Sequence, residues 1–301
     1  MSNVQPPMGR AKLGRALFKS AMTALGQDKK IIWAPVLGGL VTMAVFFTLG
    51  TAMVAAIWFS PTENSEIIGF AFAIVIGLVA AFVHVFTQAT VMAAANQRFD
   101  GQTPTIGTGL AQAKTQFGNL SKFALLEATV GTILRAVREN LQFVGNLVSF
   151  IGGLAWAVSS YFALPVILFE GLGPIASVKR SVALIKEKWG SALRLNLFAG
   201  VAFLLVWLAV FGGFFASMAG LILQSESDFQ NVPLIVASIS GMVGSILLLI
   251  GIAFVQQTVM SYACVALYRY AVGKPVPGFD PQLMQSAFRL KKQKFTGLAN
   301  A

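Results

Sequence analysis

The chain carries little charge, because only 11% of its 301 residues are Asp, Glu, Lys or Arg. About a quarter of the residues in a soluble domain are charged. With His84 counted as neutral, charge is absent from five stretches of at least 30 residues each: 31–62, 67–97, 140–169, 195–225 and 229–268. A helix crosses a bilayer with about 20 apolar residues, so each stretch can span a membrane. The pattern predicts an all-α polytopic membrane protein without a separate soluble enzyme domain.

Histidine and cysteine are almost absent, with one residue of each type. A single His and a single Cys cannot form a His/Cys metal site, and Cys264 cannot form an intrachain disulfide. Phosphate-binding glycine loops and nucleophile elbows are missing as well, and the carboxylates are scattered along the chain. We therefore predict no catalytic residue, no metal and no cofactor, and we expect the protein not to be an enzyme.

Acidic residues are half as frequent as basic ones, with 11 Asp and Glu against 22 Lys and Arg, which gives a net charge of +11. The basic residues lie beside the apolar stretches rather than in a polar domain. This distribution favours anionic membrane lipids as partners and argues against a nucleic acid. The first apolar stretch is too long, and the basic segment before it too extended, for a cleavable signal peptide.

The loop charges predict six spans rather than five. Cytoplasmic loops are rich in Lys and Arg, yet five spans would place 11 of these residues on each side of the membrane. A sixth span between Lys114 and Arg138 leaves 20 of them on the inner side and only Arg135 and Arg138 on the outer side. Both termini are then cytoplasmic, and we expect a multi-pass protein of a prokaryotic cytoplasmic membrane.

This topology divides the chain into a cytoplasmic basic segment, 1–30, a six-helix membrane domain, 31–270, and a cytoplasmic basic tail, 271–301. The predicted spans are about 31–59, 67–95, 120–138, 141–169, 195–223 and 232–268. A short amphipathic segment precedes each pair of spans, at 10–25, 106–117 and 174–188. The layout indicates three units, each with one short interfacial helix and one transmembrane hairpin.

The short segments carry the basic residues that we expect at the inner leaflet: Lys12, Arg15, Lys19, Lys179 and Arg180. The first three take the face of a helix opposite an apolar arc. Two interpretations are open: a specific lipid-binding surface, or the general anchoring that basic amphipathic helices provide in many inner-membrane proteins.

The sixth span is short, with only 12 residues between Lys122 and Arg135. It contains Glu127, the only acidic residue well inside a predicted span. A carboxylate in hydrocarbon is costly unless it is paired or protonated, so we expect this helix to pack among the others. Glu127 either binds a cation or a proton, or pairs with Lys122 or a neighbouring helix.

His84 lies near the middle of the second span, and Gln88 shares its face one helical turn later. A structural interpretation is a neutral His84 hydrogen-bonded to Gln256, Gln257 or Ser261 of the last span. The functional interpretation is an intramembrane polar site. Its candidate members are Glu127, His84, Gln88 and Gln256.

Small residues recur at every fourth position in the last two spans: Gly212, Ala216 and Gly220 in one, and Ala237, Gly241 and Ser245 in the other. Such spacing favours close helix contact within the bundle, and a homo-oligomer contact is the alternative.

Two inner-side segments look specific rather than generic: Asp100 and Gly101 with Pro104, and Glu170 and Gly171 with Pro174 and Ser181. Further residues of the same pattern are Asp28, Lys29, Lys30, Trp33 and Pro35, then Thr105, then Ala128 to Gly131 with Leu134 and Arg135. On these residues the chain resembles a family of uncharacterised six-helix prokaryotic integral membrane proteins, over most of residues 10–270.

The segment from Glu170 to Ser181 is also similar to one in the membrane domains that are fused to some glycerophosphodiester phosphodiesterases. The catalytic domain of those enzymes is missing from this chain, so the resemblance implies an architecture and no activity. Taken together, the residues favour a non-enzymatic accessory or lipid-interacting membrane protein. A small-solute transporter or channel that uses Glu127 and His84 is the alternative, and an enzyme acting on lipids ranks third.

Overall fold

The computed structural model describes residues 10–59, 65–188, 192–225 and 231–279, and within these ranges all regular secondary structure is helical. The elements are α1 Arg10–Gln27, the 3-10 helix η1 Lys29–Ile32, α2 Trp33–Trp58, α3 Ser65–Phe99, α4 Ile106–Thr115, α5 Phe117–Asn140, α6 Gln142–Ser159, α7 Ala163–Glu170, α8 Pro174–Lys188, α9 Ala192–Ser225 and α10 Val232–Ala271. The predicted all-α class is confirmed.

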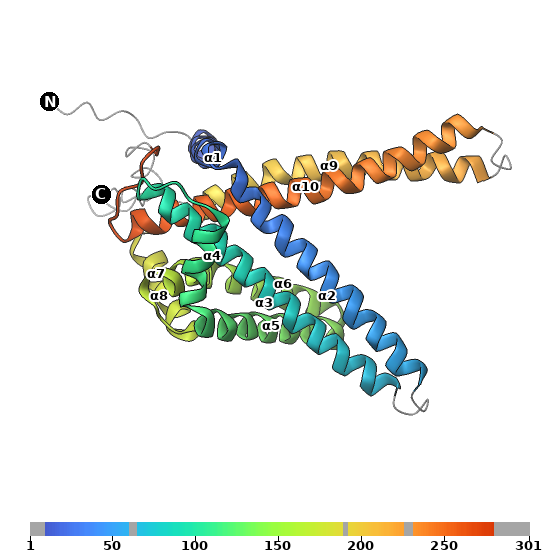
Figure 1. Cartoon of the computed structure of the whole chain (residues 1–301), viewed down its shortest axis with the longest axis horizontal. Coiled ribbons are helices and arrows are strands. Elements are labelled where there is room, and N and C mark those ends of the chain that lie inside the picture. The colour runs from blue at the N-terminus through green and yellow to red at the C-terminus, as the bar shows by residue number, and fades with distance from the viewer. Residues whose placement is uncertain (1–9, 60–64, 189–191, 226–230, 280–301) are drawn as a thin grey trace, which may run out of the picture.

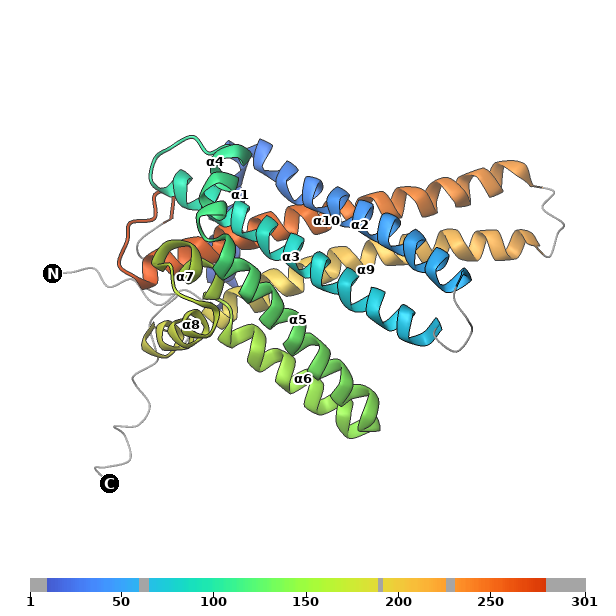
Figure 2. The same ribbon diagram turned by 60° about the horizontal axis from the view of Figure 1, so that its bottom comes forward.

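Three antiparallel hairpins, α2–α3, α5–α6 and α9–α10, leave one common end of the molecule and diverge from one another (Figures 1 and 2). We call the common end the head. It comprises α1, η1, α4, α7 and α8 with residues 85–99 of α3, 117–124 of α5 and 258–271 of α10. The rest of each hairpin is an arm, and the first, second and third arms follow chain order.

The buried core lies in the head. Its largest fully buried side chains include Tyr262, Phe123 and Phe162, from three different parts of the chain. The arms instead expose large apolar side chains on most of their surface, such as Phe47, which is 75% exposed, and Leu247, which is 63% exposed. Because exposing such a side chain to water costs roughly 1.5–3 kcal/mol, the arms require an apolar environment.

Five helical stretches of the described residues are long and apolar enough to cross a membrane: Lys29–Trp58, Ser65–Phe99, Val144–Glu170, Phe203–Leu223 and Val232–Ala271. They identify a multi-pass membrane protein. The segment predicted as the sixth span is the 24-residue helix α5, which is not among these stretches. Helix α5 differs from the five apolar stretches in its charged residues, which also kept it out of the charge-free stretches of the sequence.

The span predicted at 141–169 corresponds to Val144–Glu170, but its helix is interrupted, because the chain turns at residues 160–162 between α6 and α7. Pro165 gives the physical reason. A proline ring clashes with the carbonyl four residues earlier, which is that of Tyr161, so a continuous helix is broken there. The Cys264 thiol donates to this carbonyl oxygen at 3.3 Å. The Phe162 N–H donates to Ser181 Oγ at 3.0 Å, which binds the turn to α8.

All three short segments form helices where the sequence predicted them, as α1, α4 and α8. Each packs on a hairpin other than the one that follows it in the chain. Helix α4 packs on α3, α8 packs on α5, α6 and α7, and α1 packs on α9 and α10. The ring of Phe18 in α1 meets that of Phe203 in α9 at 5.6 Å between centroids. The short helices therefore join the three hairpins in a closed cycle.

In the head, three helices end at a glycine with positive φ: α3 at Gly101, α7 (which follows the second hairpin) at Gly171 and α10 at Gly273, with φ of +80°, +70° and +77°. Glycine is favoured at this position because it has no Cβ to clash in the left-handed conformation. A proline follows within three residues in every case, at Pro104, Pro174 and Pro275. The same helix stop thus recurs three times and supports the threefold plan.

The small residues of the last two spans lie mainly between α9 and α10. A Cβ added to Gly220 would lie 2.6 Å from Ser238 Oγ, and one added to Gly241 would lie 2.3 Å from Ser217 Oγ. Ser245 faces Gly213. The prediction of close packing within the bundle is confirmed for Gly220 and Gly241, whereas Gly212 has no neighbour within 4 Å.

Candidate functional site

Three ion pairs join helices of the head, two of them between residues far apart in the sequence. The first joins Asp28, at the end of α1, to Arg98 of α3. The Arg98 guanidinium donates from Nε and Nη2 to both carboxylate oxygens of Asp28. The Tyr262 hydroxyl of α10 donates to Asp28 Oδ2 at 3.3 Å. Since Asp28 is buried, these partners replace the water that the charge has lost.

The second ion pair joins Arg269 of α10 to Asp100, with 2.7 Å between Nη1 and Oδ1. The side chain of Arg269 is only 3% exposed, and it also donates to Asn96 Oδ1 at 2.7 Å and to the carbonyl of Pro275 at 3.0 Å. Asn96 in turn donates to Asp100 Oδ2 at 3.1 Å. This arrangement fixes the ends of α3 and α10 to each other.

The third ion pair joins Glu170, the last residue of α7, to Arg180 of α8 at 3.1 Å. The Tyr268 hydroxyl of α10 donates to Glu170 Oε1 at 2.9 Å. Helix α10 therefore reaches all three pairs, through Tyr262, Arg269 and Tyr268.

The structure brings the motif residues of the two inner-side segments into the head. Asp100 and Glu170 form ion pairs, and Gly101 and Gly171 end helices. Pro104 precedes Thr105, the N-cap of α4, whose side chain accepts from the Thr108 N–H at 3.1 Å. Pro174 is the first residue of α8, and Ser181 accepts from Phe162 as described above. These residues position the helices of the head rather than lining a pocket.

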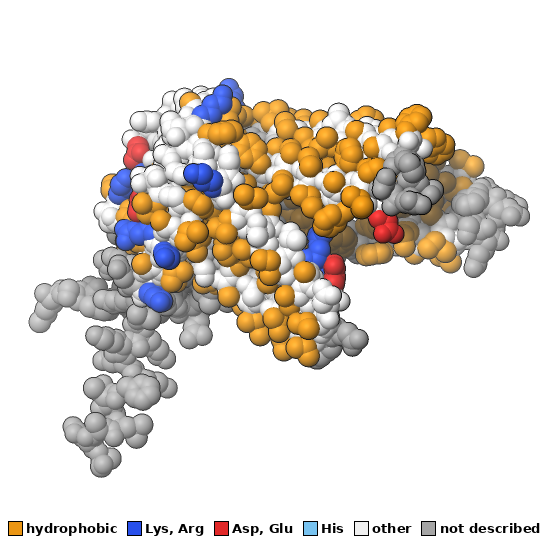
Figure 3. Space-filling view, turned by 90° about the horizontal axis from the view of Figure 1, so that it is seen from below, with side chains coloured by type: hydrophobic (Ala, Val, Ile, Leu, Met, Phe, Trp, Pro, Cys, Tyr) orange, Lys and Arg blue, Asp and Glu red, His pale blue; other side chains and the backbone are white. Residues whose placement is uncertain are grey.

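Arginine and lysine have different environments in the head. The acidic side chains described there, Asp28, Asp100 and Glu170, are each paired with an arginine. The lysines are exposed and form no ion pair within the described part of the chain: Lys19, Lys29, Lys30, Lys114, Lys122, Lys179, Lys186 and Lys274. Figure 3 shows most of the basic side chains in view at the head, while the visible arms are mostly apolar.

The predicted inner-leaflet residues fit this division only in part. Lys19 and Lys179 are exposed, whereas Arg180 is half-buried in its pair with Glu170. The side chains of Lys12 and Arg15 lie outside the described residues, as does the tail from residue 280 onward. Sequence reasoning missed Lys114, Lys186 and Lys274 as members of the same surface. Their position beside apolar stretches was the available signal.

The four candidate intramembrane residues do not form one hydrogen-bonded site. His84 is bonded to Gln88 of its own helix, with 3.1 Å between the two Nε2 atoms, rather than to α10 as the structural interpretation expected. Gln256 accepts from the indole N–H of Trp207 in α9 at 3.0 Å. The structure thus places these side chains in two separate pairs.

Glu127 continues the stripe of α5 that is buried at Leu120, Phe123 and Ala124. It forms no hydrogen bond or ion pair among the described residues, and the expected partner Lys122 is exposed. As expected, this helix packs among others: α5 contacts α3, α6, α7 and α8, and Leu126 still packs against the buried core. Nearer the tip of the arm, Gly145 and Gly152 allow α6 to approach α5 closely, and the arm diverges from the other two (Figure 2).

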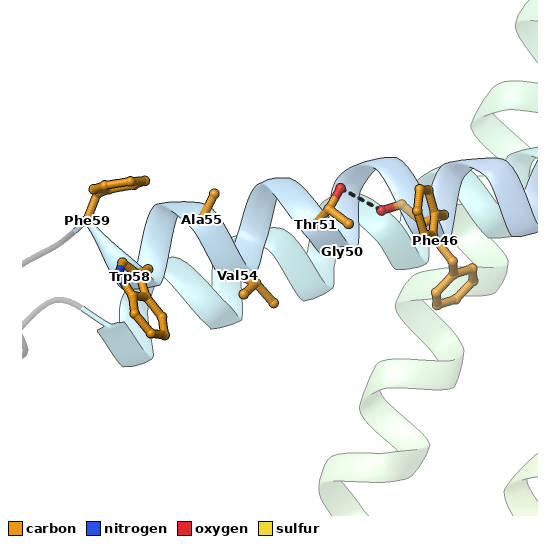
Figure 4. A pocket seen from close by; sticks show the side chains of 8 residues that line it. Phe46, Gly50, Thr51, Val54, Ala55, Trp58 and Phe59 are labelled. Atoms are coloured by element: carbon orange, nitrogen blue, oxygen red, sulfur yellow. Dashed lines mark hydrogen bonds between the residues drawn. The ribbon is translucent and has the colours of Figure 1, made fainter.

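Two surface hollows of the arms are apolar. One lies along the far half of α2 (Figure 4), where Thr51, its only side chain with a polar atom besides Trp58, donates to the carbonyl of Phe47 at 2.8 Å. The other lies between α9 and α10 beside Phe203 and Leu248. Neither hollow includes Glu127 or His84. Among the described residues, no group of three His, Cys, Asp or Glu side chains is placed to hold a metal ion.

The packed head and the exposed apolar arms define the class of the molecule as an all-α multi-pass membrane protein. The chain belongs to a family of unknown function (DUF6159), whose family model matches residues 67–278, from α3 to the segment that follows α10. No curated protein matches the chain.

Proposed function

We propose that the protein is a non-enzymatic, lipid-interacting component of a cytoplasmic membrane, with its head at the inner surface bound to anionic headgroups. The observation that carries this proposal is the division of basic residues in the head. Arginines are used to neutralise the acidic side chains, and exposed lysines remain free to meet an anionic surface. Lysine ammonium groups near a membrane surface are attracted to anionic lipids.

The proposal includes six spans with both termini in the cytoplasm. Every arm is a hairpin that begins and ends in the head, so three inserted arms return the chain to the side on which it started. The lysine-rich head then follows the rule that cytoplasmic segments are enriched in Lys and Arg. In the sequence between the first and second predicted spans and between the last two, the acidic residues Glu63, Glu66, Glu226 and Asp228 have no basic residue beside them.

Lipid retention during native mass spectrometry tests the proposal. The full chain is purified in detergent with equal amounts of phosphatidylglycerol and phosphatidylcholine, and the bound lipids are counted. We expect the wild type to retain phosphatidylglycerol in preference. The double variant Lys179→Glu, Lys186→Glu should lose most of this preference, and the charge-conserving control Lys179→Arg, Lys186→Arg should keep it. If the Glu and Arg double variants keep the same preference for phosphatidylglycerol, the proposal is overturned.

The alternative, a small-solute transporter or channel, has less support. It requires polar side chains that converge on a path, yet His84 and Gln256 have separate partners. Glu127 is the residue that still favours it, because a carboxylate without a partner inside an apolar arm is costly. A solute uptake activity that is lost on Glu127→Gln would support this function.

A further inference from the structure

The second arm is shorter than its neighbours. Outside the head it consists of residues 125–140 of α5 and the 18 residues of α6, whereas α2 in the first arm has 26 residues. At 1.5 Å per residue these lengths are about 24 Å, 27 Å and 39 Å. The hydrocarbon core of a bilayer is about 30 Å thick, so both helices of the second arm are shorter than the core that they would cross.

Polar side chains recur along the exposed surface of α5, between apolar ones. Going outward from the head it carries Lys122, Thr129, Thr132, Arg135 and Glu139, all exposed. Thr129 and Thr132 donate their hydroxyl hydrogens to carbonyls of their own helix at 2.8 Å, so their oxygens remain free to accept. We call these five residues the polar stripe.

Nothing in the described part of the chain covers the polar stripe. The apolar neighbours Leu125 and Ile133 on the same face are 55% and 56% exposed. The buried side of α5 lies on the opposite face, at Leu120, Phe123 and Ala124. Figure 2 shows the arm standing apart from the other two. If the arms are inserted, the polar stripe faces lipid.

Exposed polar groups on a lipid-facing helix match one kind of occupant, the zwitterionic or anionic headgroup of a phospholipid. The ammonium of Lys122 and the guanidinium of Arg135 can each bind a phosphate, one near the head and one near the tip of the arm. The two threonine oxygens between them can accept hydrogen bonds from headgroup amines or from water. A short helix also thins the bilayer around it, which shortens the path between the two phosphate positions.

We propose that the polar stripe conducts phospholipid headgroups between the two leaflets, so that lipids equilibrate across the membrane. The inference rests on the proposed insertion of the arms. No covalent step and no energy source are involved, so movement is passive and runs in both directions. The barrier falls because the headgroup exchanges hydrogen bonds with the stripe instead of crossing pure hydrocarbon.

Fluorescence bleaching in vesicles tests this activity. The full chain is reconstituted into vesicles of phosphatidylcholine and phosphatidylglycerol that contain a trace of phospholipid with a fluorescent headgroup, and dithionite is added outside. Dithionite does not cross the bilayer, so it bleaches the inner-leaflet label only if lipids change sides. We expect vesicles with wild-type protein to lose the label of both leaflets, and protein-free vesicles to lose only that of the outer leaflet.

Two double variants locate the activity. Thr129→Leu, Thr132→Leu removes the middle of the polar stripe and should slow the inner-leaflet loss roughly tenfold, which corresponds to about 1.4 kcal/mol of barrier. Thr48→Leu, Thr51→Leu is the matched control, since both threonines are exposed on α2 and donate to their own helix. This control should leave the rate unchanged.

The outcomes separate the two proposals. Protein that resists carbonate extraction but leaves the inner-leaflet label intact overturns lipid conduction and leaves the lipid-binding function standing. Protein that is extracted by carbonate contradicts the insertion on which both proposals depend. Equal slowing by the α5 and α2 variants would show that the polar stripe has no special role and would overturn the inference.

Discussion

The head and the arms are both helical, but they bury apolar side chains against different surroundings. In the head, Phe123 is covered by other helices and is only 1% exposed, while arginines pair with the acidic side chains. In the arms, Phe47 and Phe150 remain 75% and 69% exposed. The head therefore depends on protein contacts for its stability, whereas the arms depend on lipid. Substitutions of the same kind in the two regions should have unequal effects.

The largest difference is expected when the same side chain is removed from each region. Phe123→Ala leaves a cavity in the head and should lower the free energy of unfolding by about 3–5 kcal/mol. Phe47→Ala, on the lipid-facing surface of α2, should change it by less than about 0.5 kcal/mol. Thermal unfolding of the detergent-solubilised variants measures both. Similar losses would contradict the distinction between head and arms.

The second-largest loss of stability is expected when the ion pair between Arg269 and Asp100 is broken. Arg269→Ala leaves Asp100 and Asn96 without their donor and should cost about 3 kcal/mol, at the lower end for a buried pair because the Asp100 side chain is still 43% exposed. Arg138→Ala at the tip of the second arm is the control, and it should be close to neutral in the same unfolding measurement. A loss of stability in Arg138→Ala but not in Arg269→Ala would contradict the role of the Arg269 ion pair in stabilising the head.

Ser181→Ala should have a smaller effect. It removes the acceptor of the Phe162 N–H and leaves a buried donor unsatisfied, at a cost of about 1–3 kcal/mol. Ser121→Ala in α5 removes only a hydroxyl that donates to the carbonyl of Phe117 in its own helix. Amide hydrogen exchange around residues 160–162 should accelerate in the Ser181 variant and not in the control. Unchanged exchange would show that this bond does not hold the turn.

The smallest effect concerns the helix stop of α7. Gly171→Ala forces a Cβ into a left-handed conformation and should cost about 1 kcal/mol. Gly173, two residues later, has no positive φ and no neighbour within 4 Å of an added Cβ. Gly173→Ala is therefore the matched control in the same thermal unfolding experiment. If the two variants lose equal stability, the left-handed conformation of Gly171 is not what makes Gly171→Ala destabilising.

Local signals in the sequence predicted the elements well. Pro174 at a helix start and the apolar spacing after it predicted 174–188, which are the bounds of α8. The break before α7 was missed although Pro165 signalled it, because the long charge-free stretch of 140–169 was read as one span. Glu127 indicated that α5 packs among other helices, and α5 does contact α3, α6, α7 and α8. How far along the helix this packing extends depends on how the arms diverge.

The contacts of the head could not be predicted from the sequence. Asp28 and Arg98 are 70 residues apart, and the segment that carries Asp28 is positioned by the packing of η1 on α10. The sequence pointed to Asp100 and Glu170, but it did not show which basic residues pair with them, because several Lys and Arg residues lie on the same side of the predicted membrane domain. The docking of α1 on α9 and α10 likewise arises only when the cycle of hairpins closes.

The central claim, that the head is cytoplasmic and that all three arms cross the membrane, is tested most directly by cysteine labelling. The single Cys264 is buried, and Cys264→Ser keeps a hydrogen-bond donor toward Tyr161 while removing the thiol. Glu139→Cys at the tip of the second arm and Lys179→Cys in the head are then introduced one at a time into this background. A membrane-impermeant maleimide applied to intact cells should label Glu139→Cys, and should label Lys179→Cys only after permeabilisation. Labelling of Glu139→Cys only after permeabilisation would contradict the sixth span and the account built on it.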